Sequence, residues 1–234
     1  MPTTLVRSKR YKECEKLVDH KRYYTLLEAI ETFKQYPKVK FDESVELNFQ
    51  LGLDLKQAEG VVRGTVSLPH GSGKKVRVLC FCKGEGANDA RTAGADYVGA
   101  EDLIEKIQGG WLDFDVVVAH PDMMRDISKL GRVLGPKGLM PSPKTGTVTI
   151  SVGKAVQEVK KGKIEVKSDK TGGLHVACGK LSFPAEALVE NAKAVIKTVA
   201  DLKPASAKGD YLRSINISSS QGPGLRLQVS TVLK

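Results

Sequence analysis

Residues 76–119 read VRVLCFCKGEGANDARTAGADYVGAEDLIEKIQGGWLDFDVVVA, and this stretch decides the fold of the middle of the chain. Short apolar runs typical of strands alternate here with segments that have helical spacing: Val76–Phe81, Asn88–Ala95, Tyr97–Val98, Glu101–Ile107 and Asp115–Ala119. Strands that alternate with helices predict parallel βαβ units in an open α/β sheet. A further helix is expected to open at Pro121, because proline is favourable in the first turn of a helix.

Segments on either side of this stretch follow different patterns. Helical spacing predicts three helices, over Tyr24–Tyr36, Ala155–Val159 and Phe183–Val199. Alternating or apolar runs predict six strands, over Ser44–Leu51, Val61–Leu68, Ile164–Lys167, Leu174–Ala177, Leu212–Ile217 and Leu225–Val229. Thr25 and Glu28 form a possible capping pair at the start of the first helix. Periodicity alone does not say whether the first and last thirds of the chain pack together.

The run GRVLGPKGLMPSPKTG, residues 131–146, holds four glycines, three prolines and three basic residues, Arg132, Lys137 and Lys144. Proline removes backbone donors and glycine permits unusual backbone angles, so this run is not an ordinary helix or a central strand. Composition alone favours a linker. Apolar anchors at Leu134 and Leu139–Met140 favour instead a shaped, positively charged loop that packs onto a domain.

Net charge is +10 over 234 residues and is unevenly distributed. Residues 1–66 carry 12 basic against 10 acidic side chains, residues 67–159 carry 12 against 11, and residues 160–234 carry 13 against 6. Such a concentration of positive charge indicates a polyanion partner, although a protein that is merely rich in lysine has the same composition. The apolar runs are all too short for a membrane span, and the N-terminal residues do not resemble a signal peptide.

Enzyme and metal signals are weak. Gly84–Gly86 follows a strand, but the dinucleotide fingerprint is incomplete after it, so an ordinary βα turn is favoured. The four histidines are not part of a metal or triad motif, and His120 is better placed to cap a helix. Cys80 and Cys82 alternate along a strand and are expected to fill core volume on one face. We therefore predict no catalytic residues, no metal and no cofactor; the alternative is a nucleotide-dependent α/β enzyme built on the middle of the chain.

Several motifs in order resemble the ribosomal protein L-one family: KFDESVELNFQLGLD (40–54), VRGTVSLPHGSGKKVRV (62–78), GADYVG (94–99), the 131–146 loop, SDKTGGLH (168–175) and YLRSINISSSQGPG (211–224). The resemblance implies that residues 1–66 and 160–234 form one α+β domain, a split βαβ unit with an antiparallel sheet and helices. Residues 67–159 would form an inserted α/β Rossmann-like domain, with hinges near 67–73 and 158–163. The terminal domain would then carry nine of the ten excess positive charges.

Two segments stand out as RNA contacts. Phe41 lies beside Lys40, so the ring could stack on a base while the ammonium binds phosphate, although a core phenylalanine at a strand start is the more common arrangement. The run Ser218–Gly222 offers short hydroxyls that can bond phosphate or 2′-OH, or else forms a simple polar turn. With the resemblance, the expected RNA-binding residues are Glu28, Lys40, Phe41, Ser44, Lys167, Ser214, Ser218, Ser219, Ser220, Gln221 and Gly222.

The resemblance also implies the function. Members bind large-subunit ribosomal RNA at the mobile stalk, assist release of deacylated tRNA from the exit site and repress translation of their own mRNA. Gln221 replaces the methionine usual in the family, and Ser44 replaces a common threonine. Arg132, Lys137 and Lys144 are expected to form a secondary basic contact. We expect a cytoplasmic ribosomal protein of bacterial type, monomeric when free, with no membrane and no small-molecule substrate; the family likeness begins within about ten residues of Met1 and leaves no transit peptide.

Overall fold

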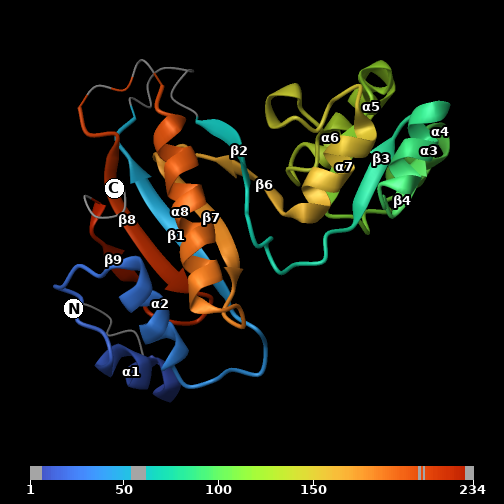
Figure 1. Cartoon of the computed structure of the whole chain (residues 1–234). Helices are drawn as coiled ribbons and strands as arrows, with labels where there is room; N and C mark the ends of the chain where they lie inside the picture. Colours follow the sequence, from blue (N-terminus) through green and yellow to red (C-terminus); the bar gives the residue numbers. More distant parts are fainter. Residues whose placement is uncertain (1–6, 54–61, 205–206, 208, 230–234) are drawn as a thin grey trace, which may run out of the picture. The chain divides into compact units, whose positions relative to one another are not determined.

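The computed structural model describes residues 7–53, 62–204, 207 and 209–229 (Figure 1). The chain divides into two compact units, residues 1–73 with 166–234 and residues 74–165. Its architecture in the described residues is mixed α/β, with an antiparallel four-stranded sheet, a parallel three-stranded sheet and a two-stranded sheet. With these boundaries the first unit has 22 basic and 15 acidic side chains, a net charge of +7, and the second has 15 and 12, a net charge of +3.

The first unit contains an antiparallel four-stranded sheet. Its strands, in the order in which they lie side by side, are β7 (Gly173–Lys180), β1 (Ser44–Leu51), β8 (Leu212–Ser219) and β9 (Leu225–Leu227). The first and last thirds of the chain are therefore interleaved within one sheet. Side chains alternate along β1, where Val45, Leu47, Phe49 and Leu51 are buried and the residues between them are partly exposed.

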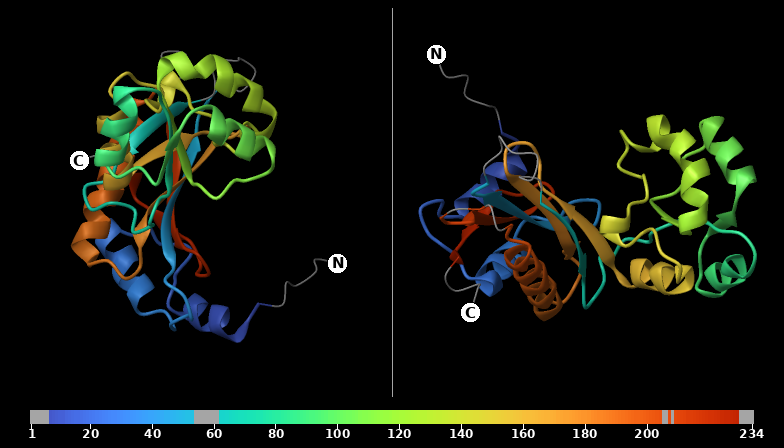
Figure 2. Two further views of the ribbon diagram at one scale, coloured as in Figure 1. Left: turned by 90° about the vertical axis from the view of Figure 1, so that its right-hand side faces the viewer. Right: turned by 90° about the horizontal axis from the view of Figure 1, so that it is seen from above.

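Two helices cover the buried face of this sheet, α2 (Leu26–Lys34) and α8 (Ala185–Asp201), and they contact each other (Figure 2). The predicted capping pair of α2 is confirmed: Thr25 Oγ1 accepts from the Glu28 amide, and the Glu28 carboxylate accepts from the Thr25 amide. A further helix, α1 (Lys9–Lys16), was not predicted from its sequence, because Cys14 is its only buried residue and the others give no apolar stripe.

The second unit contains a parallel three-stranded sheet in the order β4 (Tyr97–Gly99), β3 (Val78–Phe81), β5 (Val116–Ala119), which confirms the parallel arrangement predicted for residues 76–119. Both faces are covered. One face packs on α3 (Glu85–Thr92) and α7 (Val152–Lys161), and the other on α4 (Glu101–Gln108) and α5 (Met124–Ile127). Cys80 and Cys82 both lie in the core shared with α3 and α7, as predicted.

Glycines set several boundaries that the sequence patterns misplaced. Helix α3 begins at residue 85 rather than 88, because Gly84 adopts φ +64° and turns the chain directly into the helix. Helix α7 (Val152–Lys161) ends two residues beyond the predicted Val159, where Gly162 caps it with φ +112°. Strand β6 (Lys163–Lys167) follows and pairs with β2 (Arg63–Ser67); the predicted start of β2 at Val61 lies outside the described residues.

The 131–146 segment is only partly the loop that was predicted. Gly131–Leu134 form a short helix, α6, because the first proline comes only at position 136 and the glycine at 131 is not in a left-handed conformation. The rest of the segment is irregular except for a 3₁₀ turn over Pro143–Thr145. Leu134 is buried, and Leu139 and Met140 pack against the same core, so the predicted anchoring is confirmed.

Candidate nucleic-acid interface

The face of the four-stranded sheet that does not carry α2 and α8 is polar. Strand alternation directs Ser44 and Asn48 of β1, and Asn216 and Ser218 of β8, to this face, where all four are partly exposed. One row crosses all four strands, because His175 pairs with Asn48, Asn48 with Asn216, and Asn216 with Arg226. A sheet surface with amide, hydroxyl and cationic groups can hydrogen-bond bases, sugars and phosphates.

Hydrogen bonds fix the centre of this face. Asn48 Oδ1 lies 2.7 Å from His175 Nδ1, and Asn48 Nδ2 donates to Ser218 Oγ at 3.0 Å. The amide of Asn48 is thus oriented by partners on both neighbouring strands. A preoriented polar group loses little conformational freedom when a ligand binds.

The two segments expected to contact RNA meet at one end of the sheet. The Ser44 amide donates to Ser220 Oγ at 3.0 Å, which joins the start of β1 to the loop after β8. Lys180 at the end of β7 donates to Ser44 Oγ at 2.8 Å and to the Asp42 carbonyl at 3.3 Å. Residues from three distant parts of the chain therefore converge around Ser44.

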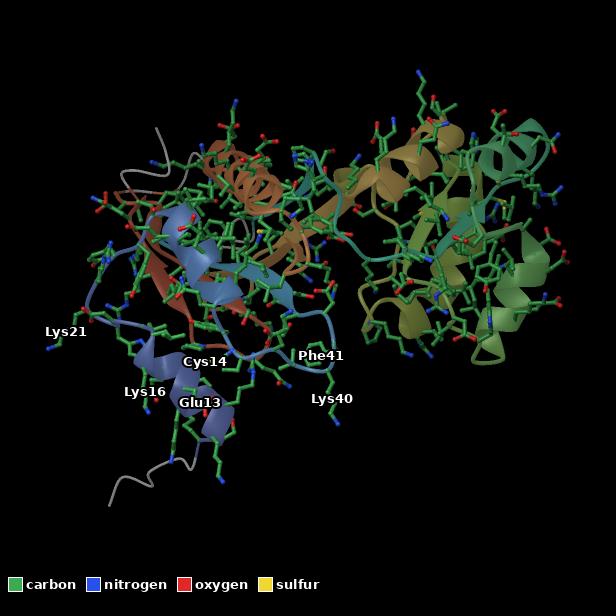
Figure 3. All side chains as sticks on the ribbon, turned by 60° about the horizontal axis from the view of Figure 1, so that its bottom comes forward. Glu13, Cys14, Lys16, Lys21, Lys40 and Phe41 are labelled. Atoms are coloured by element: carbon green, nitrogen blue, oxygen red, sulfur yellow. The ribbon has the colours of Figure 1, made fainter. Side chains whose placement is uncertain are left out.

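Lys40 and Phe41 lie side by side on the loop between α2 and β1, and the Lys40 side chain extends away from the ribbon (Figure 3). Phe41 is 50% exposed. The alternative of a core phenylalanine is therefore wrong, and the ring is available for stacking. A lysine beside an exposed ring pairs a phosphate-binding charge with a stacking surface.

One expectation about the Ser218–Gly222 segment is corrected, and the role of its glycine is explained. Ser219 is 4% exposed, because strand alternation turns it into the core, so it is not available as an RNA contact. Gly222 does not have a positive φ. A Cβ at this position would instead lie 2.5 Å from Ser219 Oγ and 2.8 Å from the Tyr36 ring, so the glycine is required by internal crowding rather than by backbone conformation.

Other expected residues lie apart from this cluster. Glu28 is engaged in the α2 cap and in an ion pair with Arg22 at 2.7 Å, and its bonds with Thr25 hold the pKa of its carboxyl below the usual range. Ser214 lies further along β8, opposite Gln50. Lys167 is exposed at the end of β6, in the two-stranded sheet that β6 forms with β2.

The remaining expected residues are exposed, two of them beside the Ser44 cluster and three in the second unit. Ser220 and Gln221 are exposed at the loop after β8. Arg132, Lys137 and Lys144 are exposed in the second unit and carry its basic loop.

Sequence reasoning missed several members of the interface. Asn48 and Asn216 could have been found, because the predicted strands place them on the same face as Ser44 and Ser218. Lys180 and Arg10 gave no such signal, since their partners in this cluster are up to 211 positions away in the sequence.

In the described part of the chain, no three histidine, cysteine or acidic side chains are grouped so that they could hold a metal ion. His120 Nδ1 accepts from the Asp122 amide at the start of a 3₁₀ turn, which confirms its capping role. All four cysteines are buried, and burial raises the pKa of the Cys178 thiol to about 12. No helix in the described residues has the length and apolar character needed to cross a membrane.

The fold and this surface define a class of protein: a two-unit α/β protein whose more basic unit displays a polar sheet face. Comparison with known proteins gives the family. Residues 33–223 match the ribosomal protein L1p/L10e family, and the chain belongs to it. The chain is 51% identical over 228 residues to the large ribosomal subunit protein uL1 of Kosmotoga olearia, an alignment that covers 97% of this chain and 99% of that protein. The alternative of a nucleotide-dependent enzyme is therefore wrong.

Proposed function

We propose that the chain is a uL1-type protein of the large ribosomal subunit and that it binds large-subunit ribosomal RNA through its first unit. One observation carries this proposal: Ser220 bonds Ser44, so the loop that bears Lys40 and Phe41 and the loop after β8 form one surface beside the polar sheet face. The net charge of +7 on the same unit favours a polyanion. The relative from Kosmotoga olearia, which is named large ribosomal subunit protein uL1, supports the assignment.

The residues proposed to contact RNA each have a distinct role. Phe41 stacks on an unpaired base, Lys40 binds phosphate, and Ser218 and Ser220 bond phosphate or 2′-OH oxygens. The exposed side chain of Gln221 carries an amide where an apolar side chain is usual in the family. It therefore contacts RNA by hydrogen bonding rather than by apolar packing on a base. Ser214 and Lys167 extend the contact along the first unit, and Arg132, Lys137 and Lys144 form a secondary contact from the second unit.

The finer organisation follows the family. The first unit acts as a split βαβ domain, corresponding to residues 1–66 and 160–234, and residues 67–159 act as an inserted Rossmann-like domain. The connections near 67–73 and 158–163 act as hinges. Because α7 extends to Lys161, Gly162 is the most suitable pivot of the second connection.

Further partners are exit-site tRNA and the protein's own mRNA. The protein acts in the cytoplasm on the ribosome and is a monomer when free.

Crosslinking in cells, followed by sequencing of the attached RNA, tests the proposal directly. Large-subunit ribosomal RNA should dominate the crosslinked sequences, and a population without it would contradict the assignment. Binding of a large-subunit RNA transcript should also weaken with salt, with log K falling by about 0.7–0.9 per tenfold increase in salt for each phosphate contacted. A slope shallower than about −2 would argue against an electrostatic interface.

Two lysine variants distinguish RNA binding at this face from non-specific attraction of RNA to a basic protein. Lys40→Ala should weaken binding and make the salt slope shallower by about one phosphate contact. Lys197→Ala is the matched control, because Lys197 is an equally charged, exposed residue on α8, which covers the opposite face of the sheet. Equal losses in the two variants would indicate non-specific attraction rather than a defined interface.

A further inference from the structure

Arg10, near the start of α1, reaches across to both segments of the proposed interface. Its Nε donates to the Pro37 carbonyl at 2.9 Å, and its Nη1 donates to the Gln221 carbonyl at 3.0 Å. Its Nη2 lies 3.1 and 3.2 Å from the two carboxylate oxygens of Glu43. The side chain is 20% exposed, so most of the guanidinium is engaged within the protein.

Glu43 completes the arrangement from the opposite side. Glu43 is 3% exposed, and its Oε1 accepts a hydrogen bond from the backbone N–H of Gln221 at 3.0 Å. Gln221 therefore has its N–H held by Glu43 and its C=O held by Arg10. Arg10 thus bonds three residues. Pro37 and Glu43 flank Lys40 and Phe41 in the sequence, and Gln221 lies in the loop after β8.

A buried ion pair is seldom justified by stability alone, because the cost of removing two charges from water offsets most of their attraction. Its directional bonds do restrict geometry: the planar guanidinium offers five donors in a fixed arrangement. Here those donors reach two loops that neighbour each other only in the folded chain.

We propose that Arg10 and Glu43 are positioning residues for RNA binding, which hold the 37–43 loop and Gln221 in the binding-competent arrangement before RNA arrives. This inference rests on the proposed function. Helix α1 then belongs to the binding apparatus through its contacts with the protein, with no need for Arg10 to touch RNA. Without the pair, the cost of ordering both loops is incurred on binding, and affinity falls by about tenfold.

The test uses the full chain with both members of the pair replaced. Arg10→Met combined with Glu43→Met removes every bond of the pair and leaves no buried charge without a partner. Arg10→Lys keeps the charge but not the set of directed donors. Lys12→Ala is the control, because Lys12 is an exposed residue of equal charge on the same helix. Each variant is examined for thermal unfolding, for affinity and salt slope with a large-subunit RNA transcript, and for hydrogen exchange of the Gln221 amide.

The double variant should bind about tenfold more weakly with an unchanged salt slope, and its Gln221 amide should exchange faster while the Ile217 amide within β8 does not. Arg10→Lys should fall between the double variant and the wild type, and Lys12→Ala should leave the Gln221 exchange unchanged. A salt slope reduced by one contact would show that Arg10 binds phosphate directly, which overturns the inference. Wild-type affinity in the folded double variant, or unaltered Gln221 exchange, would also overturn it. Failure of the wild-type chain to bind the RNA would instead refute the proposed function.

Discussion

Phe41→Ala tests the interface most sharply, because stability and RNA affinity should change by different amounts. The side chain is 50% exposed, so truncation loses about half of the burial energy of a phenylalanine. Full burial contributes up to about 3 kcal/mol, and the free energy of unfolding should therefore fall by only about 1–1.5 kcal/mol. Loss of one stacked base should weaken RNA binding roughly ten- to a hundredfold, since such stacking contributes about 1–3 kcal/mol.

Urea unfolding and titration with a large-subunit RNA transcript, both on the same preparation, measure the two effects. Leu27→Ala provides the control, because Leu27 on α2 is 47% exposed and its truncation should alter affinity little. A loss of about 3–5 kcal/mol in stability, with unchanged affinity in the folded fraction, would refute the reasoning and return Phe41 to the core.

Three further predictions concern the rest of the molecule. Gly222→Ala should lower the free energy of unfolding by about 1–3 kcal/mol, because the new Cβ would crowd Ser219 and Tyr36; urea midpoints equal to wild type would contradict this. Hydrogen bonds from Lys74 and Arg77 lower the pKa of Asp115 from 3.8 to about 2. The ionised Asp115 therefore stabilises the folded state fully above pH 3.8, and this stabilisation is lost as the pH falls toward 2. The stability advantage of wild type over Asp115→Asn, about 1–2 kcal/mol, should therefore shrink over that range in acid titrations of unfolding. All four cysteine thiols are buried, so iodoacetamide should modify them only after unfolding, and rapid labelling of the native chain would contradict this.

Much of the fold is local in origin and was therefore predictable. The apolar runs around Leu79 and Val117 are buried on both faces, and such strands appear in a sequence as continuous apolar stretches. The α2 cap depends on Thr25 and Glu28, three positions apart, so its signature lies within one turn of helix. Boundaries failed where glycine conformation decided them, as at Gly84, because composition does not reveal the sign of φ.

The interface was predictable only in part. Exposed Lys40 and the hydroxyl run after β8 were visible as residue types, and the family resemblance assigned them to one surface. Ser219 was misjudged because its orientation depends on how far β8 continues before the turn. The Arg10–Glu43 pair gave no sequence signal, since a packed α1 is needed to bring its guanidinium to the loops.

The interleaved sheet of the first unit has a consequence for biosynthesis. Strand β1 is complete at Leu51, but its partner β8 is complete only at Ser219. At synthesis rates of roughly 5–20 residues per second, β1 waits about 8–34 s for that partner. Residues 74–165, with cores of their own, are all made during the interval. The nascent chain thus completes its second unit while the apolar residues of β1 still lack their sheet, and this strand, among the first to leave the ribosome, is among the last to be buried.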